Sequence, residues 1–124
     1  MKIEADFTGA ETVQFSDVYL ESILLNLLTN AIKYAHPTRY PVIKIKTYRD
    51  ADGKLKLTFS DNGIGMNMER VKNKIFGLYQ RFHNNADAKG IGLYLVHSQV
   101  TALEGKIEVE SEEGVGTTFT ITFK

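Results

Sequence analysis

Apolar and polar residues follow two different periodicities along this chain. In the segment 17–35, apolar residues recur at the spacing of one face of an α-helix: Leu20, Leu24, Leu27, Leu28 and Ala31. The same spacing returns between Gly90 and Leu103, and a shorter helix is predicted from about Asn67 to Phe76. Ser16 is a suitable N-cap for the first helix. We expect Pro37 to close that helix and Gly105 to be the C′ residue after the last one.

Alternation of apolar and polar residues predicts the strands. It is found at Ile43–Ile45, Leu55–Phe59, Lys106–Ser111 and Thr117–Phe123. The turn Asp50–Gly53 joins the first pair into a hairpin, and the turn Gly114–Gly116 joins the last pair. Short strands are also predicted at Ile3–Phe7 and Val13–Phe15, around the turn at 8–10.

One-faced strands and amphipathic helices together predict a two-layer α/β (α+β) sandwich. About three helices would cover one face of a mixed, mainly antiparallel sheet of about five strands. The 124 residues suit one domain over 1–124, with room for a single core.

Composition narrows the class of protein and partner. The chain is 43% apolar and 24% charged, as soluble globular domains are. Its 15 basic and 15 acidic residues cancel, so we expect no nucleic acid partner and no direct contact with a membrane. The absence of cysteine excludes disulfides, cysteine-based zinc sites and cysteine nucleophiles, and it fits a reducing compartment.

Two asparagines stand one helical turn apart, at Asn26 and Asn30. Asparagine is a poor helix former, so two on one line cost helix stability, and a solvated polar stripe is the plain alternative. A neutral amide oxygen can join phosphate oxygens and water around Mg²⁺ without adding negative charge. One turn on, Lys33 could meet a phosphate and Tyr34 could pack on a base.

A glycine loop follows the second strand of the predicted hairpin, from Asp61 to Gly65. A simple turn is the plain interpretation, but the second glycine and the apolar Ile64 and Met66 are unusual for one. An Asp carboxylate there could accept a hydrogen bond from the exocyclic amino group of adenine, which guanine lacks at that position. The glycines would let the backbone approach a flat base.

Gly90, Ile91, Gly92 and Leu93 open the last helix, where free N–H groups can meet a phosphate. The segment is neither a P-loop nor a dinucleotide fingerprint, because it lacks the Gly-Lys-Ser/Thr ending and no strand leads directly into it. The histidines His36, His83 and His97 have no metal-ligand spacing and are expected to be structural or exposed.

Taken in order, these motifs resemble the ATP-binding catalytic domain of sensor histidine kinases, a Bergerat-type fold within the gyrase-like ATPase superfamily. The resemblance covers essentially the whole chain. It is carried by five stretches, which resemble the N, G1, F and G2 boxes and the closing hairpin: Glu21–Tyr34, Asp61–Met66, Ile75–Phe82, Gly90–Val96 and Glu104–Phe119.

The resemblance implies ATP and Mg²⁺ as cofactors and a role for each matching residue. Asn30 would hold the metal, Asp61 would read adenine with Thr117 helping through water, and Tyr34 would lie against the base. Residues 77–89 would form a lid over the nucleotide. The implied catalytic residues are Asn26, Asn30, Lys33 and Arg81. The implied nucleotide-binding residues are Asn30, Lys33, Tyr34, Asp61, Gly63, Ile64, Gly65, Tyr79, Lys89, Gly90, Ile91, Gly92, Leu93 and Thr117. Phe76 and Tyr79 would anchor the lid.

The resemblance also implies partners and a location. The γ-phosphoryl group would pass to a histidine on a separate helical domain of the same protein, and from there to a response regulator. No such helical hairpin is found in these residues, and Ala88 replaces the first glycine that the lid often has. We expect a cytoplasmic, monomeric domain, whether or not the parent protein is anchored in a membrane.

Two other functions compete with the kinase interpretation. Hydrolytic ATPases of the gyrase and mismatch-repair class resemble this fold, but they carry a water-activating glutamate one turn before the metal-binding asparagine. Here that position is Asn26, whose amide cannot act as a base. A degenerate docking module without catalysis is the other competitor, and the intact glycines and Asp61 argue against it.

Overall fold

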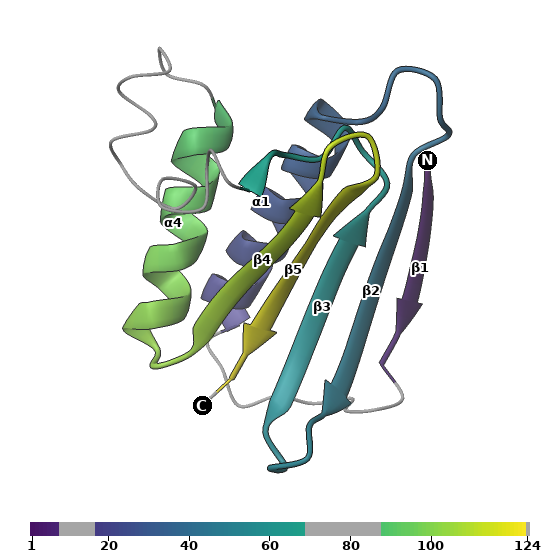
Figure 1. Cartoon of the computed structure of the whole chain (residues 1–124). Helices are drawn as coiled ribbons and strands as arrows, with labels where there is room; N and C mark the ends of the chain where they lie inside the picture. The colour runs from purple at the N-terminus through teal and green to yellow at the C-terminus, as the bar shows by residue number, and fades with distance from the viewer. Residues whose placement is uncertain (8–16, 69–87, 124) are drawn as a thin grey trace.

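The computed structural model describes residues 1–7, 17–68 and 88–123, which form two layers (Figure 1). One layer is a five-stranded sheet in the order β1-β2-β3-β5-β4. Its strands are β1 (Lys2–Asp6), β2 (Val42–Arg49), β3 (Leu55–Asp61), β4 (Lys106–Glu112) and β5 (Gly116–Thr122). Strand β1 pairs with β2 in parallel, and the other pairs are antiparallel. The predicted mixed, mainly antiparallel sheet is confirmed.

The second layer consists of two helices, α1 (Asp17–Lys33) and α4 (Ala88–Ala102), which lie against each other on one face of the sheet (Figure 1). Two of the three predicted helices are therefore found. The short helix predicted over Asn67–Phe76 lies almost entirely outside the described residues. The predicted strand at Val13–Phe15, the N-cap Ser16 and the lid at 77–89, apart from its last two residues, lie outside them as well.

The core fills the space between the helices and the central strands. Because side chains alternate along a strand, β2, β3 and β5 each send every second residue toward the helices. The side chains with less than 2% exposure come from both layers: Ile23, Leu27, Ile43, Phe59, Leu93, Val96, Val100 and Ile121. The opposite face of β3 and β5 carries hydroxyl side chains, among them the pair Ser60 and Thr118, whose oxygens lie 3.0 Å apart.

The hairpin turn between β2 and β3 is confirmed. Asp50 Oδ1 accepts hydrogen bonds from the N–H groups of Asp52 and Lys54, each at 2.9 Å. Hydrogen bonding from the Lys54 backbone, more than the other influences, holds the pKa of Asp50 below its usual value. Gly53 adopts a φ of 78°, and a Cβ at this position would meet no neighbouring atoms within 4 Å. Glycine is therefore needed here for the turn conformation and not for space.

Helix α1 differs from the prediction at its C-terminal end, and helix α4 differs at both ends. Helix α1 ends at Lys33, before the predicted limit at Ala35, and the Tyr34 carbonyl oxygen accepts a hydrogen bond from the Ile64 N–H at 3.0 Å. Helix α4 begins at Ala88 rather than Gly90, because Ala88 and Lys89 are good helix formers that extend it. The N–H groups of this helix without an intrahelical partner therefore end at Gly90, and those of Ile91 and Leu93 lie inside the helix.

The C-terminal end of α4 corrects the prediction that Gly105 is the C′ residue. Glu104 occupies the left-handed conformation there, with a φ of 64°. Its N–H donates to the Thr101 carbonyl at 3.0 Å, and the Gly105 N–H donates to the Val100 carbonyl at 2.9 Å. These two bonds form a Schellman motif with Glu104 at C′. Gly105 is needed for space, since a Cβ there would lie 3.0 Å from the Thr122 carbonyl oxygen.

A left-handed non-glycine residue is strained, so the variant Glu104→Gly is expected to stabilise the domain by about 0.5–1 kcal/mol. Urea denaturation of the two proteins measures this difference. Glu104→Ala is the matched control, because it removes the same side chain but keeps the strain. Equal stability of the alanine and glycine variants would show that the backbone conformation is not the cause.

Candidate functional site

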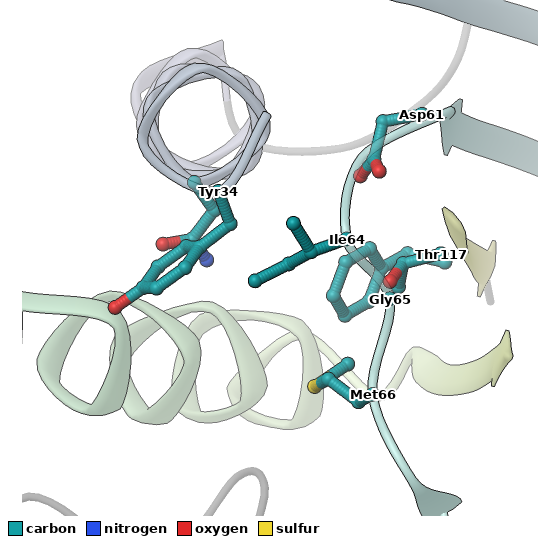
Figure 2. A pocket seen from close by; sticks show the side chains of 8 residues that line it. Tyr34, Asp61, Ile64, Gly65, Met66 and Thr117 are labelled. Carbon is teal, nitrogen blue, oxygen red and sulfur yellow. The ribbon is translucent and has the colours of Figure 1, made fainter. Parts of the chain in front are cut away.

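A pocket opens between the C-terminal end of α1, the loop after β3 and the strand β5 (Figure 2). Figure 2 shows Tyr34 on one side of it and Asp61 and Thr117 on the other, with Ile64 between them. The residues that line it are Asn30, Tyr34, Asp61, Ile64, Gly65, Met66, Thr117 and Phe119. All but Met66 and Phe119 were predicted as site residues, so three segments far apart in the sequence meet as expected.

The glycines of the loop are required by neighbouring protein atoms. A Cβ on Gly63 would lie 2.6 Å from the Tyr34 carbonyl oxygen and 2.9 Å from Asp61 Oδ1. Gly65 has a φ of 70°, and a Cβ there would overlap the Glu112 carbonyl group. From the sequence we expected these glycines to allow approach to a base. In the structure they allow the loop to pass the end of α1 and the β4–β5 turn.

Hydrogen bonds fix the same loop from three sides. The Gly63 N–H donates to Asp61 Oδ1 at 2.9 Å, which sets the orientation of that carboxylate. The Ile64 N–H donates to the Tyr34 carbonyl, and the Gly114 N–H donates to the Ile64 carbonyl at 2.7 Å. The loop is therefore held by bonds to its own Asp61 side chain, to the end of α1 and to the β4–β5 turn.

Two contributors to this site were missed from the sequence. Arg39 Nη2 donates to the Gly63 carbonyl at 3.0 Å. Ser111 accepts a hydrogen bond from the Met66 N–H at 2.8 Å, and its oxygen lies 2.8 Å from Thr117 Oγ1. A single arginine in an irregular segment, or a single serine in a strand, carries no periodic or motif signal that would mark it.

Asp61 and Thr117 form the polar wall of the pocket. They lie directly opposite each other on β3 and β5. Thr117 is 8% exposed and is one of two buried polar residues among those described, which places its hydroxyl group at the floor rather than in solvent. Beside this polar wall, Ile64, Met66 and Phe119 supply apolar surface. A flat molecule with one polar edge would match that arrangement.

Asn30 reaches the pocket from α1, and its side-chain nitrogen Nδ2 is buried without a hydrogen-bond partner. Leaving such a group unpaired costs about 1–3 kcal/mol. A polar ligand in the pocket explains why it is kept, because the amide could then pair with that ligand through its nitrogen or, after rotation, its oxygen. The magnesium-binding role of Asn30 stays a prediction, and the position of Asn30 in the pocket is compatible with it.

The other predicted residues of α1 lie differently. Asn26 is half-buried one turn earlier and does not line the pocket. Lys33 is exposed, and its Nζ lies 5.5 Å from the centre of the Tyr34 ring, within reach of a cation–π interaction. This contact keeps an ammonium group near the mouth of the pocket.

Helix α4 passes beside the pocket (Figure 2). The backbone of Lys89, Gly90, Ile91 and Gly92 lies in its first turns, as predicted, and the side chain of Leu93 is buried in the core. Leu93 thus anchors the helix by packing its side chain in the core. Tyr79 and Arg81 lie outside the described residues.

The described part of the chain holds no group of three or more His, Cys, Asp or Glu side chains placed to bind a metal ion. None of its helices has the length and apolar character needed to cross a membrane.

Comparisons with known proteins give a consistent picture. The family model described as "Histidine kinase-, DNA gyrase B-, and HSP90-like ATPase" matches residues 16–124. The sensor protein RprX of Bacteroides fragilis is 36% identical over 97% of this chain and 24% of its own length. The heme sensor protein HssS of Staphylococcus saprophyticus is 34% identical over 85% of this chain and 22% of its own. The chain therefore spans about a quarter of the length of these relatives.

Solved structures of low sequence identity share the fold. Full-length ShkA in complex with AMPPNP superposes with a TM-score of 0.78 at 22% identity, over 98% of this chain and 25% of that protein. The mycobacterial sensor histidine kinase MprB gives a TM-score of 0.76 at 23% identity, over 98% of this chain and 82% of that one.

Proposed function

The chain belongs to the family of histidine kinase-, DNA gyrase B- and HSP90-like ATPases, and we propose that it is the ATP-binding catalytic domain of a sensor histidine kinase. The family expected from the sequence is thereby confirmed. The curated relatives named above are sensor proteins, and others are named as histidine kinases, which supports the kinase interpretation over the hydrolytic one.

The observation that carries the proposal is that Asn30, whose side-chain nitrogen Nδ2 is buried without a hydrogen-bond partner, lines the same pocket as Asp61 and Thr117. The pocket thus offers the side chain of Asn30 to a metal–phosphate unit, and the side chains of Asp61 and Thr117 to the polar edge of a base. Adenine would lie with its amino group toward Asp61 and Thr117. Tyr34 and Ile64 would contact its faces.

Asn30 would hold Mg²⁺ through its amide oxygen, since this ion prefers oxygen ligands and keeps several waters. When bound, the ion would neutralise charge on the phosphates. The phosphates would extend toward the first turn of α4, where the N–H groups of residues 88–90 can meet them. Lys89 is proposed to bind them as well, from its residue type and its position in the sequence. Lys33 and Arg81 would add positive charge there, and the lid at 77–89, with Phe76 and Tyr79, would cover them.

The chemistry proposed is phosphoryl transfer to an imidazole. The acceptor histidine is itself a nucleophile, so the domain mainly has to position the γ-phosphoryl group and stabilise charge. Hydrolysis would need a general base on water. Asn26 cannot be that base, and exposed Glu21 precedes Asn30 by about two and a half helical turns, which puts it on the opposite side of α1.

The acceptor histidine is proposed to sit on a separate helical domain of the full-length protein, which would pass the phosphoryl group on to a response regulator. Residues 1–124 would then be one monomeric domain working in the cytoplasm. Neither nucleic acid nor membrane is proposed as a partner.

Incubation with γ-labelled ATP tests this assignment. The isolated chain is expected to release phosphate very slowly and to acquire no label on His36, His83 or His97, because Asn26 cannot act as a base for water and the acceptor histidine is proposed to lie on a separate helical domain. Adding a cognate helical hairpin that carries a histidine should produce acid-labile, base-stable label on that hairpin. Asn30→Asp should reduce the transfer while the domain stays folded.

Two results would contradict the proposal in different ways. Acid-labile label on the isolated chain would show that the acceptor lies within it. Rapid phosphate release would instead favour the hydrolytic ATPase.

A further inference from the structure

Ser111 lies on β4, behind the polar wall of the pocket, and is bonded to three groups at once. It accepts from the Met66 N–H at 2.8 Å and donates to the Gly116 carbonyl at 2.9 Å. Its oxygen also lies 2.8 Å from Thr117 Oγ1, where either hydroxyl could be the donor. Ser111 does not itself line the pocket between α1 and the loop.

The direction of the Ser111–Thr117 bond follows from counting hydrogens. A carbonyl oxygen can only accept, so the single hydroxyl hydrogen of Ser111 is committed to Gly116. The Met66 N–H can only donate, so it takes one of the two lone pairs of Ser111. Ser111 can then only accept from Thr117, and this uses its last lone pair. The Thr117 hydrogen therefore points at Ser111.

With its hydrogen committed, Thr117 has only lone pairs left for the pocket. Asp61, as a carboxylate, also offers only acceptors. A water that bridged the two side chains would spend both of its hydrogens on them, and it too would face the ligand with lone pairs. The polar wall formed by Asp61 and Thr117 thus consists of acceptors alone.

We propose that Ser111 is a positioning residue that holds Thr117 as an acceptor and thereby makes the pocket select a base with an amino group at its polar edge. This inference rests on the proposed function, because it assumes that a nucleotide base occupies the pocket. Without Ser111, the Thr117 hydroxyl could turn and donate. A base with an oxygen at that position would then be accepted more readily.

Calorimetric titration with Mg-ATP and with Mg-inosine triphosphate provides the test, because hypoxanthine carries an oxygen where adenine carries its amino group. Hypoxanthine also carries a hydrogen on N1, where adenine has a lone pair. This second difference is the same for every variant, so the change in the affinity ratio between variants is the measured quantity. The wild-type chain should prefer ATP. Ser111→Ala should lower the ratio of the two affinities about tenfold, since the misplaced donor is worth about one hydrogen bond. Ser111→Thr, which keeps the hydroxyl group, should retain the wild-type preference.

Ser60→Ala is the matched control. It removes a hydroxyl group that is paired across β3 and β5 in the same way, with Thr118 at 3.0 Å, but on the face away from the pocket. It should leave the ratio unchanged. Thr117→Val keeps the shape of the side chain without its hydroxyl group, so it removes the acceptor while Ser111 keeps its bonds to Met66 and Gly116, and it should also lower the preference. In that background Ser111→Ala should have no further effect on the ratio.

The outcomes separate this inference from the proposed function. If Ser111→Ala weakened the binding of both nucleotides equally and kept the ratio of the two affinities, Ser111 would have only a structural role, and the inference would be overturned. An unchanged ratio in Thr117→Val, or equal affinities in the wild type, would overturn it as well. If the wild-type chain binds neither nucleotide, the proposed function fails and the inference fails with it.

Discussion

Replacing Gly65 with alanine is expected to destabilise the domain by at least about 3 kcal/mol. Two costs add at this position. The φ of 70° puts an alanine in the left-handed region, which costs roughly 1–2 kcal/mol, and the new Cβ would overlap the Glu112 backbone. Backbone on both sides cannot move aside as a side chain could. Urea denaturation gives the free energy of unfolding, and nucleotide affinity should fall together with it, because Gly65 and Ile64 line the pocket.

Gly53→Ala is the matched control for this experiment. Gly53 has a similar φ of 78°, but no atom lies within 4 Å of the position its Cβ would take. Only the conformational cost should appear, about 1–2 kcal/mol, and nucleotide affinity should stay as in the wild type. If the two variants lost equal amounts of unfolding free energy, the close packing of the loop against Glu112 would contribute nothing to stability.

Replacing Asp61 with asparagine is expected to weaken ATP binding by roughly 1–3 kcal/mol with little effect on stability. Asparagine keeps an oxygen that can accept the Gly63 N–H, now 2.9 Å from Asp61 Oδ1, so the loop should keep its shape. The other half of the side chain changes from acceptor to donor and would face the adenine amino group. Calorimetric titration with Mg-ATP, Mg-ADP and Mg-GTP measures the change.

Asp52→Asn serves as the control, because Asp52 is an exposed carboxylate in the β2–β3 turn. It should bind nucleotides like the wild type. Wild-type affinity for ATP in Asp61→Asn, or equal affinity of the wild type for ATP and GTP, would remove Asp61 from base recognition.

The fold was predictable from the sequence wherever burial follows a period. Residues Leu57 and Phe59 on β3, and Phe119 and Ile121 on β5, alternate with polar residues because one face of the sheet is covered by helices. That alternation predicts the strands and the buried face. It cannot predict the parallel pairing of β1 with β2, because every residue of β1 is exposed and gives no burial pattern to match.

The site was predictable where residue type and motif coincide, as for Asn30, Asp61 and Thr117. It was not predictable where a single residue acts through long-range hydrogen bonds, as Ser111 and Arg39 do. At the C-terminal end of α4, one position needs a left-handed backbone conformation and the next needs a small side chain, and only the second is a glycine. A Cβ on Gly105 would lie in tight contact with the Thr122 carbonyl oxygen, while Glu104 takes the left-handed position that sequence statistics assign to glycine.

The central claim is that a magnesium nucleotide occupies the pocket between α1, the 61–66 loop and β5. Titration of the ¹⁵N-labelled chain with Mg-ADP, followed by amide chemical shifts, tests it most directly. We expect the largest shifts at Gly63, Gly65 and Thr117, and small shifts at Lys44 and Thr120 on the outer face of the sheet. Shifts confined to that outer face, or no shifts at millimolar nucleotide, would contradict the account.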